Sequence, residues 1–322
     1  MLKHTLCGIT RPTGHRVLAE AFMAGVMLLA VGCSGATANP TAIPIIEKTL
    51  TLAPGVTMTF VRVPAGEFLM GSTDGDKDAS DGEKPQSKVS VDEFWIGKYD
   101  VTNAQFRAFS EATGYKTTAE QQDSGWTFDE HEGWHETKGA NWRHPRGPDS
   151  TLNGKDNHPV VQITWDDAVA FAEWAAQSTG KKIAVPTEAQ WEKAARGTDG
   201  RFFPWGNQAP DAARLNYNQI VMDTTEVGKY SPAGDSPYGA ADMAGNVWQW
   251  TSSLWGVTLE KPDYGYPYHA NDGREDPSNR NARVLRGGGY FEVHNIRCAV
   301  RLGNYSDDRG VSLGFRVVAT AI

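Results

Sequence analysis

The sequence predicts an α+β domain with few helices, many short strands and long loops. The chain has 34 glycines and 17 prolines that are spread along its length, so turns are frequent throughout. Its 11 tryptophans lie mostly in blocks punctuated by Gly, Asn or Pro, which indicates large aromatic anchors for loops. Clear helical spacing of apolar residues occurs in only two stretches, so we expect two main helices.

Residues 1–38 have the layout of an export signal, in which a basic leader precedes a mostly apolar stretch over 17–31 and then small residues. Three outcomes are open: lipidation of Cys33, cleavage after Ala38, or an uncleaved anchor. The apolar stretch is shorter than the ~20 residues that a membrane-spanning helix needs. We expect an exported protein that is periplasmic or held at the outer membrane or cell surface, with the membrane contacted only by its N-terminus.

Residues 39–54 are rich in Pro, Ala and Thr and indicate a linker, so the folded domain is expected to span 55–322. Alternating apolar residues predict the first strands at 58–63, 67–70 and 89–96. Beyond residue 198 the pattern indicates short strands joined by long loops, with no repeat of fixed period. One domain is therefore the economical interpretation.

Capping residues delimit three helices, which are predicted over 103–113, 165–179 and 188–196. Each follows a threonine, a favoured N-cap, and each is followed by a glycine, which commonly ends a helix. In the second helix, apolar residues recur at i, i+3, i+4 and i+7, namely Ala168, Phe171, Ala172 and Ala175. The first two helices are long enough to pack against a sheet, and the third is short.

Charge and cysteine content exclude several classes of protein. The formal charge is −8 and the leader is basic, so the exported part is more acidic still. Phosphate binding requires a basic face, so nucleic acid is excluded as a partner. Cys7 lies in the leader and Cys33 is either removed or lipidated, which leaves Cys298 as a lone thiol. The exported domain therefore has no internal disulfide.

Six ordered motifs resemble those of the formylglycine-generating enzyme, or sulfatase-modifying factor, family. They lie within 58–318 and are Val63–Ser72, Tyr99–Phe106, Pro186–Arg196, Phe203–Asn207, Gly245–Thr251 and Leu313–Arg316. The resemblance implies a variant of the C-type lectin fold, with little regular secondary structure, small antiparallel sheets, two main helices and loops closed around calcium.

The resemblance also implies two structural Ca²⁺ sites, because the family binds this ion through oxygen ligands. The matching positions are Asp242 and Gln249 with the carbonyls of Gly245 and Val247 at the first site, and Asn216, the Tyr217 carbonyl and Asp223 at the second. Gln249 replaces the family's usual glutamate, which should weaken the first site. The alternative is that these residues only make turn hydrogen bonds.

In the family, formylglycine is produced by two cysteines that bind copper(I), a metal suited to thiolate ligands. They follow an Arg/Lys-Gly-Gly-Ser-aromatic motif, for which this chain has Arg286–Tyr290. Glu292 stands at the position of the first cysteine, and the second is absent. Cys298 matches a family core cysteine, so we expect no copper and no formylglycine-generating activity.

Two other sets of residues are candidates for a site. Glu292 and His294 lie two apart in an apparent strand, so both could face one cleft as acid and base, or both could be surface groups. Trp142, Arg143 and Trp255 could line the groove that receives peptide in the family, or could be structural anchors.

Two further groups are assigned structural or solvated roles. Arg286, Arg301 and Arg316 recur in the family regardless of activity, so we expect them to bind buried carbonyls and carboxylates. A second group is rich in His and Glu, namely His131, His135 and His144 with Glu130, Glu132 and Glu136. Its spacing could hold a transition metal, but no metal-binding signature is met, so we interpret it as a solvated loop.

Two functions are compatible with these expectations. The first is a calcium-organised binding or assembly module that takes a protein or peptide ligand. The alternative is a cysteine-independent maturation enzyme, oxidoreductase-like, as in periplasmic siderophore maturation. An active formylglycine-generating oxidase is disfavoured, because a bis-thiolate copper site cannot be built from one thiol.

Overall fold

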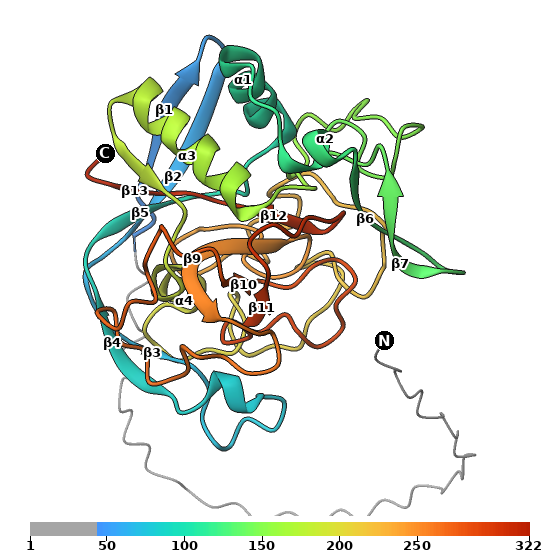
Figure 1. Cartoon of the computed structure of the whole chain (residues 1–322). Coiled ribbons are helices and arrows are strands. Elements are labelled where there is room, and N and C mark those ends of the chain that lie inside the picture. Colours follow the sequence, from blue (N-terminus) through green and yellow to red (C-terminus); the bar gives the residue numbers. More distant parts are fainter. Residues whose placement is uncertain (1–43) are drawn as a thin grey trace, which may run out of the picture. The chain divides into compact units, whose positions relative to one another are not determined.

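The computed structural model describes residues 44–322 and contains two curved sheets (Figure 1). The first is fully antiparallel, with strand order β1-β2-β5-β13-β8. Its strands are β1 (Glu47–Ala53), β2 (Val56–Val63), β5 (Phe94–Gly97), β13 (Val318–Thr320) and β8 (Lys182–Ala184). The C-terminal strand β13 lies between β5 and β8, so both ends of the described chain contribute to one sheet.

The linker predicted over 39–54 is wrong for its second half. Residues Glu47–Ala53 form β1, which pairs with β2 from Glu47 opposite Val61 to Ala53 opposite Val56. The alternation of Thr49, Thr51 and apolar neighbours fits a strand at the edge of a sheet, and Gly55 at φ 76° makes the turn to β2. The predicted leader and Cys33 lie outside the described residues.

The second sheet has the order β11-β10-β9-β12, in which only β12 runs parallel to its neighbour. Its strands are β11 (Leu302–Asn304), β10 (Ala282–Arg286), β9 (Trp248–Gly256) and β12 (Leu313–Phe315). Two hairpins complete the strands: β3 (Gly66–Met70) with β4 (Ser87–Val91), and β6 (Ser124–Asp129) with β7 (Gly133–Lys138). The single strand predicted over 89–96 is therefore two strands, β4 and β5, in different sheets.

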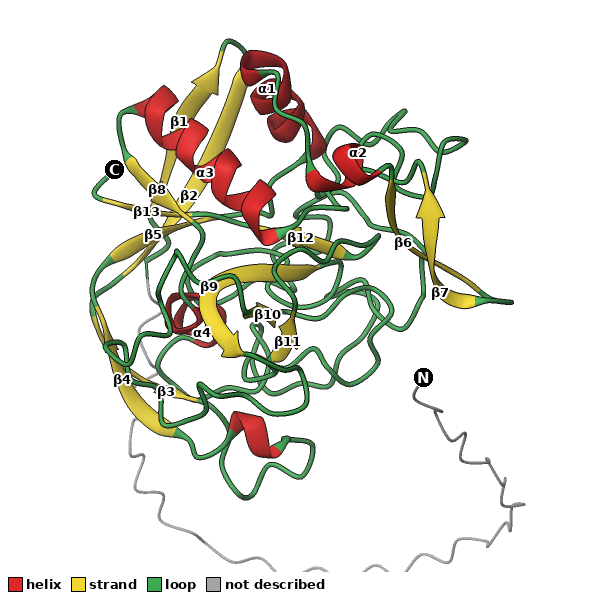
Figure 2. Ribbon diagram, in the orientation of Figure 1, coloured by secondary structure: helices red, strands yellow, loops and turns green. Residues whose placement is uncertain are grey.

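The three predicted helices are confirmed as α1 (Asn103–Thr113), α3 (Trp165–Thr179) and α4 (Glu188–Arg196) (Figure 2). Each begins with a threonine capping box, which satisfies two free N–H groups at the first turn. Two short elements were not predicted: α2 (Thr118–Gln122), a single capped turn, and a 3₁₀ turn at Asp81–Glu83. Among residues 44–322, no helix combines the length and apolar character needed to cross a membrane.

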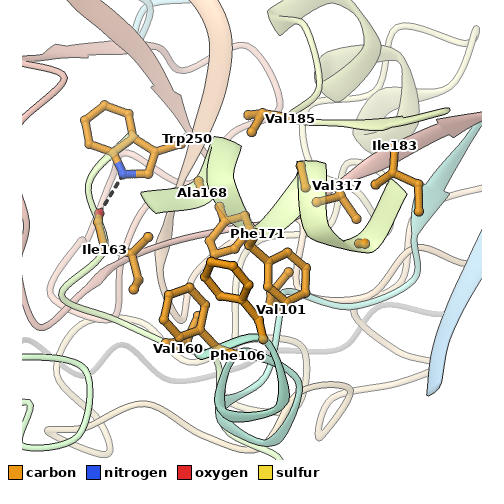
Figure 3. Close-up of a cluster of buried hydrophobic side chains, with 14 of the residues drawn as sticks. Val101, Phe106, Val160, Ile163, Ala168, Phe171, Ile183, Val185, Trp250 and Val317 are labelled. Carbon is orange, nitrogen blue, oxygen red and sulfur yellow. Dashed lines mark hydrogen bonds between the residues drawn. The ribbon is translucent and has the colours of Figure 1, made fainter. Parts of the chain in front are cut away.

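The main core lies where α1 and α3 pack against the five-stranded sheet (Figure 3). Phe106 of α1 stacks on Phe171 of α3, with ring centroids 6.0 Å apart. Trp250 of β9 is fully buried and donates its indole N–H to the Ile163 carbonyl at 2.8 Å, which ties the second sheet to the residue before the α3 cap. Aromatic anchoring of loops, which the tryptophan blocks predicted, is thus present at this junction.

Buried arginines bind carbonyls and carboxylates of distant segments, as predicted for Arg286, Arg301 and Arg316. Arg286 pairs with Glu192 and donates to the carbonyls of Ala299 and Val300. Arg316 donates to the carbonyls of Gly97 and Ala241 and pairs with Asp100 at 3.2 Å. These side chains hold irregular backbone in place where no sheet is available to satisfy it.

Candidate functional site

A cleft of about 430 Å³ opens between the β6–β7 hairpin and the loop that follows β10. We call it the aromatic cleft. The side chains that matter for its chemistry are Trp126, Trp134, Trp248, Phe291, Glu292 and Asp308. They come from four separate parts of the chain, so the cleft exists only in the folded domain.

The hairpin supplies one wall. In antiparallel pairing Phe128 lies opposite Trp134, and Trp126 is two residues away on the same face of β6. Trp134 contacts Phe291 with ring centroids 5.0 Å apart, and Phe128 contacts the same ring at 4.9 Å. Trp126 and Trp134 remain 38% and 47% exposed, which is unusual for such large apolar side chains and leaves their rings open to a ligand.

Glu292 lies in the cleft wall and is held from two sides. Its Oε1 accepts the indole N–H of Trp248 at 3.3 Å, and its Oε2 accepts an N–H of Asn295 at 3.0 Å. The backbone is fixed as well, since the Glu292 carbonyl accepts the N–H of Asn218 at 2.8 Å. The carboxylate is therefore positioned by neutral donors.

The predicted pairing of Glu292 with His294 is not found. Residues 290–301 form turns and loop instead of the expected strand, because Gly288 at φ 77° and the turn at Tyr290 end the extended backbone of β10. His294 is exposed and does not line the aromatic cleft. The two side chains consequently do not form an acid and base pair facing one cavity.

Asp308 and Arg309 line the cleft in a segment that lies beside β6, where the Trp126 N–H donates to the Arg309 carbonyl at 3.3 Å. Burial raises the pKa of the Asp308 carboxyl, and a hydrogen bond from Asn304 partly offsets this. Arg309 is only 6% exposed and its guanidinium turns to the hairpin, where it donates to the Ser124 carbonyl at 3.0 Å and pairs with Glu136 at 3.4 Å. Its ion pair is thus with the hairpin, although its charge also lowers the pKa of Asp308.

The groove predicted from Trp142, Arg143 and Trp255 is wrong, because these residues do not lie together in one site. Trp142 is fully buried in the main core and donates its indole N–H to Glu120 at 3.2 Å, with the Arg143 guanidinium stacked 4.1 Å from its ring. Trp255 lies in a separate small core and borders a different surface cavity near Tyr266. The two tryptophans act as anchors in separate regions.

At the first predicted calcium site, the oxygen of Gln249 is already used. Its Oε1 accepts the indole N–H of Trp191 and the Nε–H of Arg316, each at 2.7 Å, and its Nε2 donates to the Asp242 carbonyl at 2.8 Å. The Gly245 carbonyl accepts the N–H of Val247 at 2.9 Å. With a guanidinium beside it and both lone pairs occupied, Gln249 does not fit the role of a cation ligand.

The second predicted site fits a cation better. Asn216 is 1% exposed, and its Oδ1 is buried without a hydrogen-bond partner among the described residues. The Tyr217 carbonyl lies next along the chain and accepts only the N–H of Ile220 at 3.1 Å. Asp223, however, pairs with Lys155 at 2.5 Å. The donor set available to a cation is therefore Asn216 with backbone carbonyls, without the Asp223 carboxylate.

Cys298, the single cysteine in residues 44–322, is fully buried beside Trp191 and Tyr238 in the second core. Burial raises the pKa of its thiol to about 12. The thiolate is the reactive form, so this side chain behaves as a small apolar core residue.

The aromatic cleft was not predicted, because residues 130–136 were interpreted as a solvated loop. The usable signal was the alternation of Trp126 and Phe128 before a Glu-His-Glu-Gly turn and the aromatic Trp134 after it, which is typical of a hairpin with one aromatic face. The contact of this face with Phe291, more than 150 residues away, had no local signal.

Several known proteins resemble this chain over most of its length. The profile of the family described as "Sulfatase-modifying factor enzyme 1-like domain" matches residues 51–321. Formylglycine-generating enzyme of Mus musculus is 36% identical over 83% of this chain and 78% of its own. Inactive C-alpha-formylglycine-generating enzyme 2 of Bos taurus is 35% identical over 84% of this chain and 91% of its own.

Among solved structures, PvdO from Pseudomonas aeruginosa superposes with a TM-score of 0.65 and 25% identity, covering 85% of this chain and 98% of that one. The fold expectation from the sequence is therefore confirmed: a low-regularity α+β domain of the formylglycine-generating enzyme type.

Proposed function

Because the chain belongs to the sulfatase-modifying factor family, we propose that it is an exported binding or assembly module whose protein or peptide ligand enters the aromatic cleft. The observation that supports this most is the pair of exposed indoles, Trp126 and Trp134, on the wall of an open cavity. Exposed aromatic side chains contribute strongly to binding, because they bury a large rigid area at small entropic cost.

We infer that the oxidase centre is missing, which favours binding over the family's copper chemistry. Glu292 stands where a thiolate ligand would be required, and the buried Cys298 has no access to the cleft. Copper(I) prefers soft thiolate ligands, and a carboxylate is a hard ligand. We therefore infer that the protein takes no copper and makes no formylglycine.

Export and calcium complete the proposal. We infer that residues 1–38 direct export, with Cys33 as the lipidation position if the N-terminus is anchored. We also infer one structural Ca²⁺ at Asn216, supported by its buried, unpartnered oxygen. A cation there would satisfy that oxygen and would fix the loop that carries Asn218, which in turn binds the Glu292 carbonyl.

Affinity capture from the exported fraction of the native host tests the binding role. The wild-type protein and Trp134→Ala serve as bait, with Phe202→Ala as a matched control, since Phe202 is equally exposed at 43% and lies outside the cleft. We expect a specific ligand to be lost with W134A and retained with F202A. Equal capture by all three would exclude the cleft as the ligand site.

A direct chemical test addresses the family's activity. The purified protein is incubated with copper(I) and a Cys-x-Pro-x-Arg peptide, and the peptide mass is followed. We expect no aldehyde. Its formation would overturn the proposal.

A second candidate function is cysteine-independent maturation chemistry with Glu292 as a proton acceptor. The placement of this carboxylate in an open cleft favours it, and the likeness to PvdO covers most of the chain. The distinguishing variant is Glu292→Gln, which keeps the shape and the contact with Trp248. A catalyst would lose turnover of its captured ligand while keeping affinity, whereas a binding module would leave the captured ligand chemically unchanged.

A further inference from the structure

The aromatic cleft combines apolar rings with carboxylates that have no cationic partner. Within residues 44–322, neither Glu292 nor Asp308 forms an ion pair, although Glu292 has two neutral donors and Asp308 one from Asn304. Arg309, the cationic residue among those that line the cleft, binds Ser124 and pairs with Glu136 on the hairpin, although its charge also lowers the pKa of Asp308. The cleft thus presents to a ligand two carboxylates that no ion pair neutralises.

The rings beside these carboxylates can bind a cation through their faces. Trp126 and Trp134 are more than one-third exposed, and the edge-to-face contacts of Trp134 with Phe128 and Phe291, at interplanar angles of 63° and 62°, leave ring surface uncovered. An organic cation within ~6 Å of an indole centroid is attracted by the ring quadrupole, most strongly when the cation is poorly hydrated.

We propose that the aromatic cleft binds a ligand through an alkylated ammonium group, which lies against Trp126 and Trp134 and faces the carboxylates of Glu292 and Asp308. This deepens the proposed binding function and rests on it. A quaternary ammonium suits the site because it offers charge and apolar surface and needs no hydrogen-bond acceptors. Both oxygens of Glu292 already accept an N–H, so the carboxylate supplies mainly its charge.

The environment of Asp308 also favours a cationic ligand. Burial raises the pKa of its carboxyl and the neighbouring Asp307 adds to this, while Asn304 and Arg309 offset part of the rise. A cation bound in the cleft would stabilise the ionised form and offset this cost. A neutral apolar ligand of equal size would bury the carboxylate further and make that cost larger.

The test is a calorimetric titration of the purified full chain with choline and with 3,3-dimethylbutan-1-ol, its neutral isostere. We expect saturable binding of choline and at least tenfold weaker binding of the alcohol. Glu292→Gln and Asp308→Asn, which keep side-chain shape, should each weaken choline binding several-fold, and W134A should abolish it. The matched control Glu67→Gln removes an exposed carboxylate on β3, outside the cleft, and should change nothing.

Three results would overturn the proposal: equal binding of choline and the alcohol, tighter binding of methylguanidinium than of choline, or no saturable binding of choline. Thermal melting confirms that each variant is folded. Failure here is distinguishable from failure of the binding role, because a ligand captured by the wild type and lost with W134A would still show that the cleft binds a partner of other chemistry.

Discussion

Arg301 and Glu188 form a fully buried, bidentate ion pair, with Nε to Oε1 at 2.7 Å and Nη2 to Oε2 at 2.9 Å. The guanidinium also donates to the carbonyls of Gly82 and Tyr264, so one side chain connects helix α4 to two long loops. Although burial opposes it, the charge of Arg301 keeps the pKa of Glu188 below its usual range. A fold in which long loops join the regular elements depends on such contacts to hold those loops.

Breaking this pair should be strongly destabilising. Arg301→Met leaves the Glu188 carboxylate buried without its main partner, and we expect a loss of about 3–5 kcal/mol in the free energy of unfolding. Urea denaturation monitored by tryptophan fluorescence measures it. The double variant Glu188→Gln with Arg301→Met should lose less than the sum of the single variants. As a control, Lys88→Ala removes an exposed pair with Glu67 at 3.8 Å and should cost less than about 1 kcal/mol.

The thiol of Cys298 should not react with alkylating reagents in the native protein. Its thiol pKa of about 12 and complete burial mean that almost no accessible thiolate exists at pH 8.5. Iodoacetamide treatment followed by mass spectrometry of the peptide containing Cys298 should show no modification, and full modification after unfolding in urea. Rapid native alkylation would contradict the assignment of this residue to the core.

Calcium should stabilise the domain through Asn216 and not through Gln249. At a hundredfold excess over Kd, a bound ion adds about 2.7 kcal/mol to the free energy of unfolding, and chelation removes it. We expect the rise in Tm on adding Ca²⁺ to persist in Gln249→Ala and to vanish in Asn216→Ala. Comparing increments within each variant removes the effect of the substitution itself. If the rise in Tm on adding Ca²⁺ were lost only in Gln249→Ala, calcium would instead bind at the first predicted site.

The buried pair of Glu83 and Arg297 should make stability depend on pH in the acid range. Burial raises the pKa of Glu83, but the hydrogen bond and charge of Arg297 at 2.8 Å outweigh it, so the folded pKa lies below the model-peptide value of 4.5. The pair therefore stabilises the fold above pH 4.5, and this contribution is lost as the pH falls through the folded pKa. In Glu83→Gln, the decrease in Tm between pH 5 and pH 3 should be smaller than in the wild type. An unchanged slope would contradict the role of the pair.

Local sequence signals predicted local structure well. Thr102, Thr164 and Thr187 cap helices at the predicted residues, because a capping box and a terminal glycine are determined within a few positions of the chain. The error at β1 has the same origin. Thr49 and Thr51 alternate in a polar segment that forms a strand only because β2 follows after a tight turn and offers an edge.

The candidate site was predicted less well, because it depends on contacts between distant segments. Trp142 and Trp134 are both tryptophans in loop-rich regions, yet one is fully buried against Glu120 and the other is 47% exposed beside Phe291. Composition and spacing do not show which of the two side chains is buried and which is exposed. Likewise, the family pattern placed Gln249 at a cation, while Arg316 and Trp191 together occupy its oxygen.

By itself the sequence determined the family and the capped helices, since a motif order and a capping residue are properties of the chain alone. Only the tertiary structure decided that Glu292 is anchored by Trp248 while His294 turns to solvent, and that the β6–β7 hairpin walls the cleft. The reason is physical: side-chain exposure and hydrogen-bond partners are set by packing between segments far apart in the chain, and that packing leaves no periodic signal in either segment.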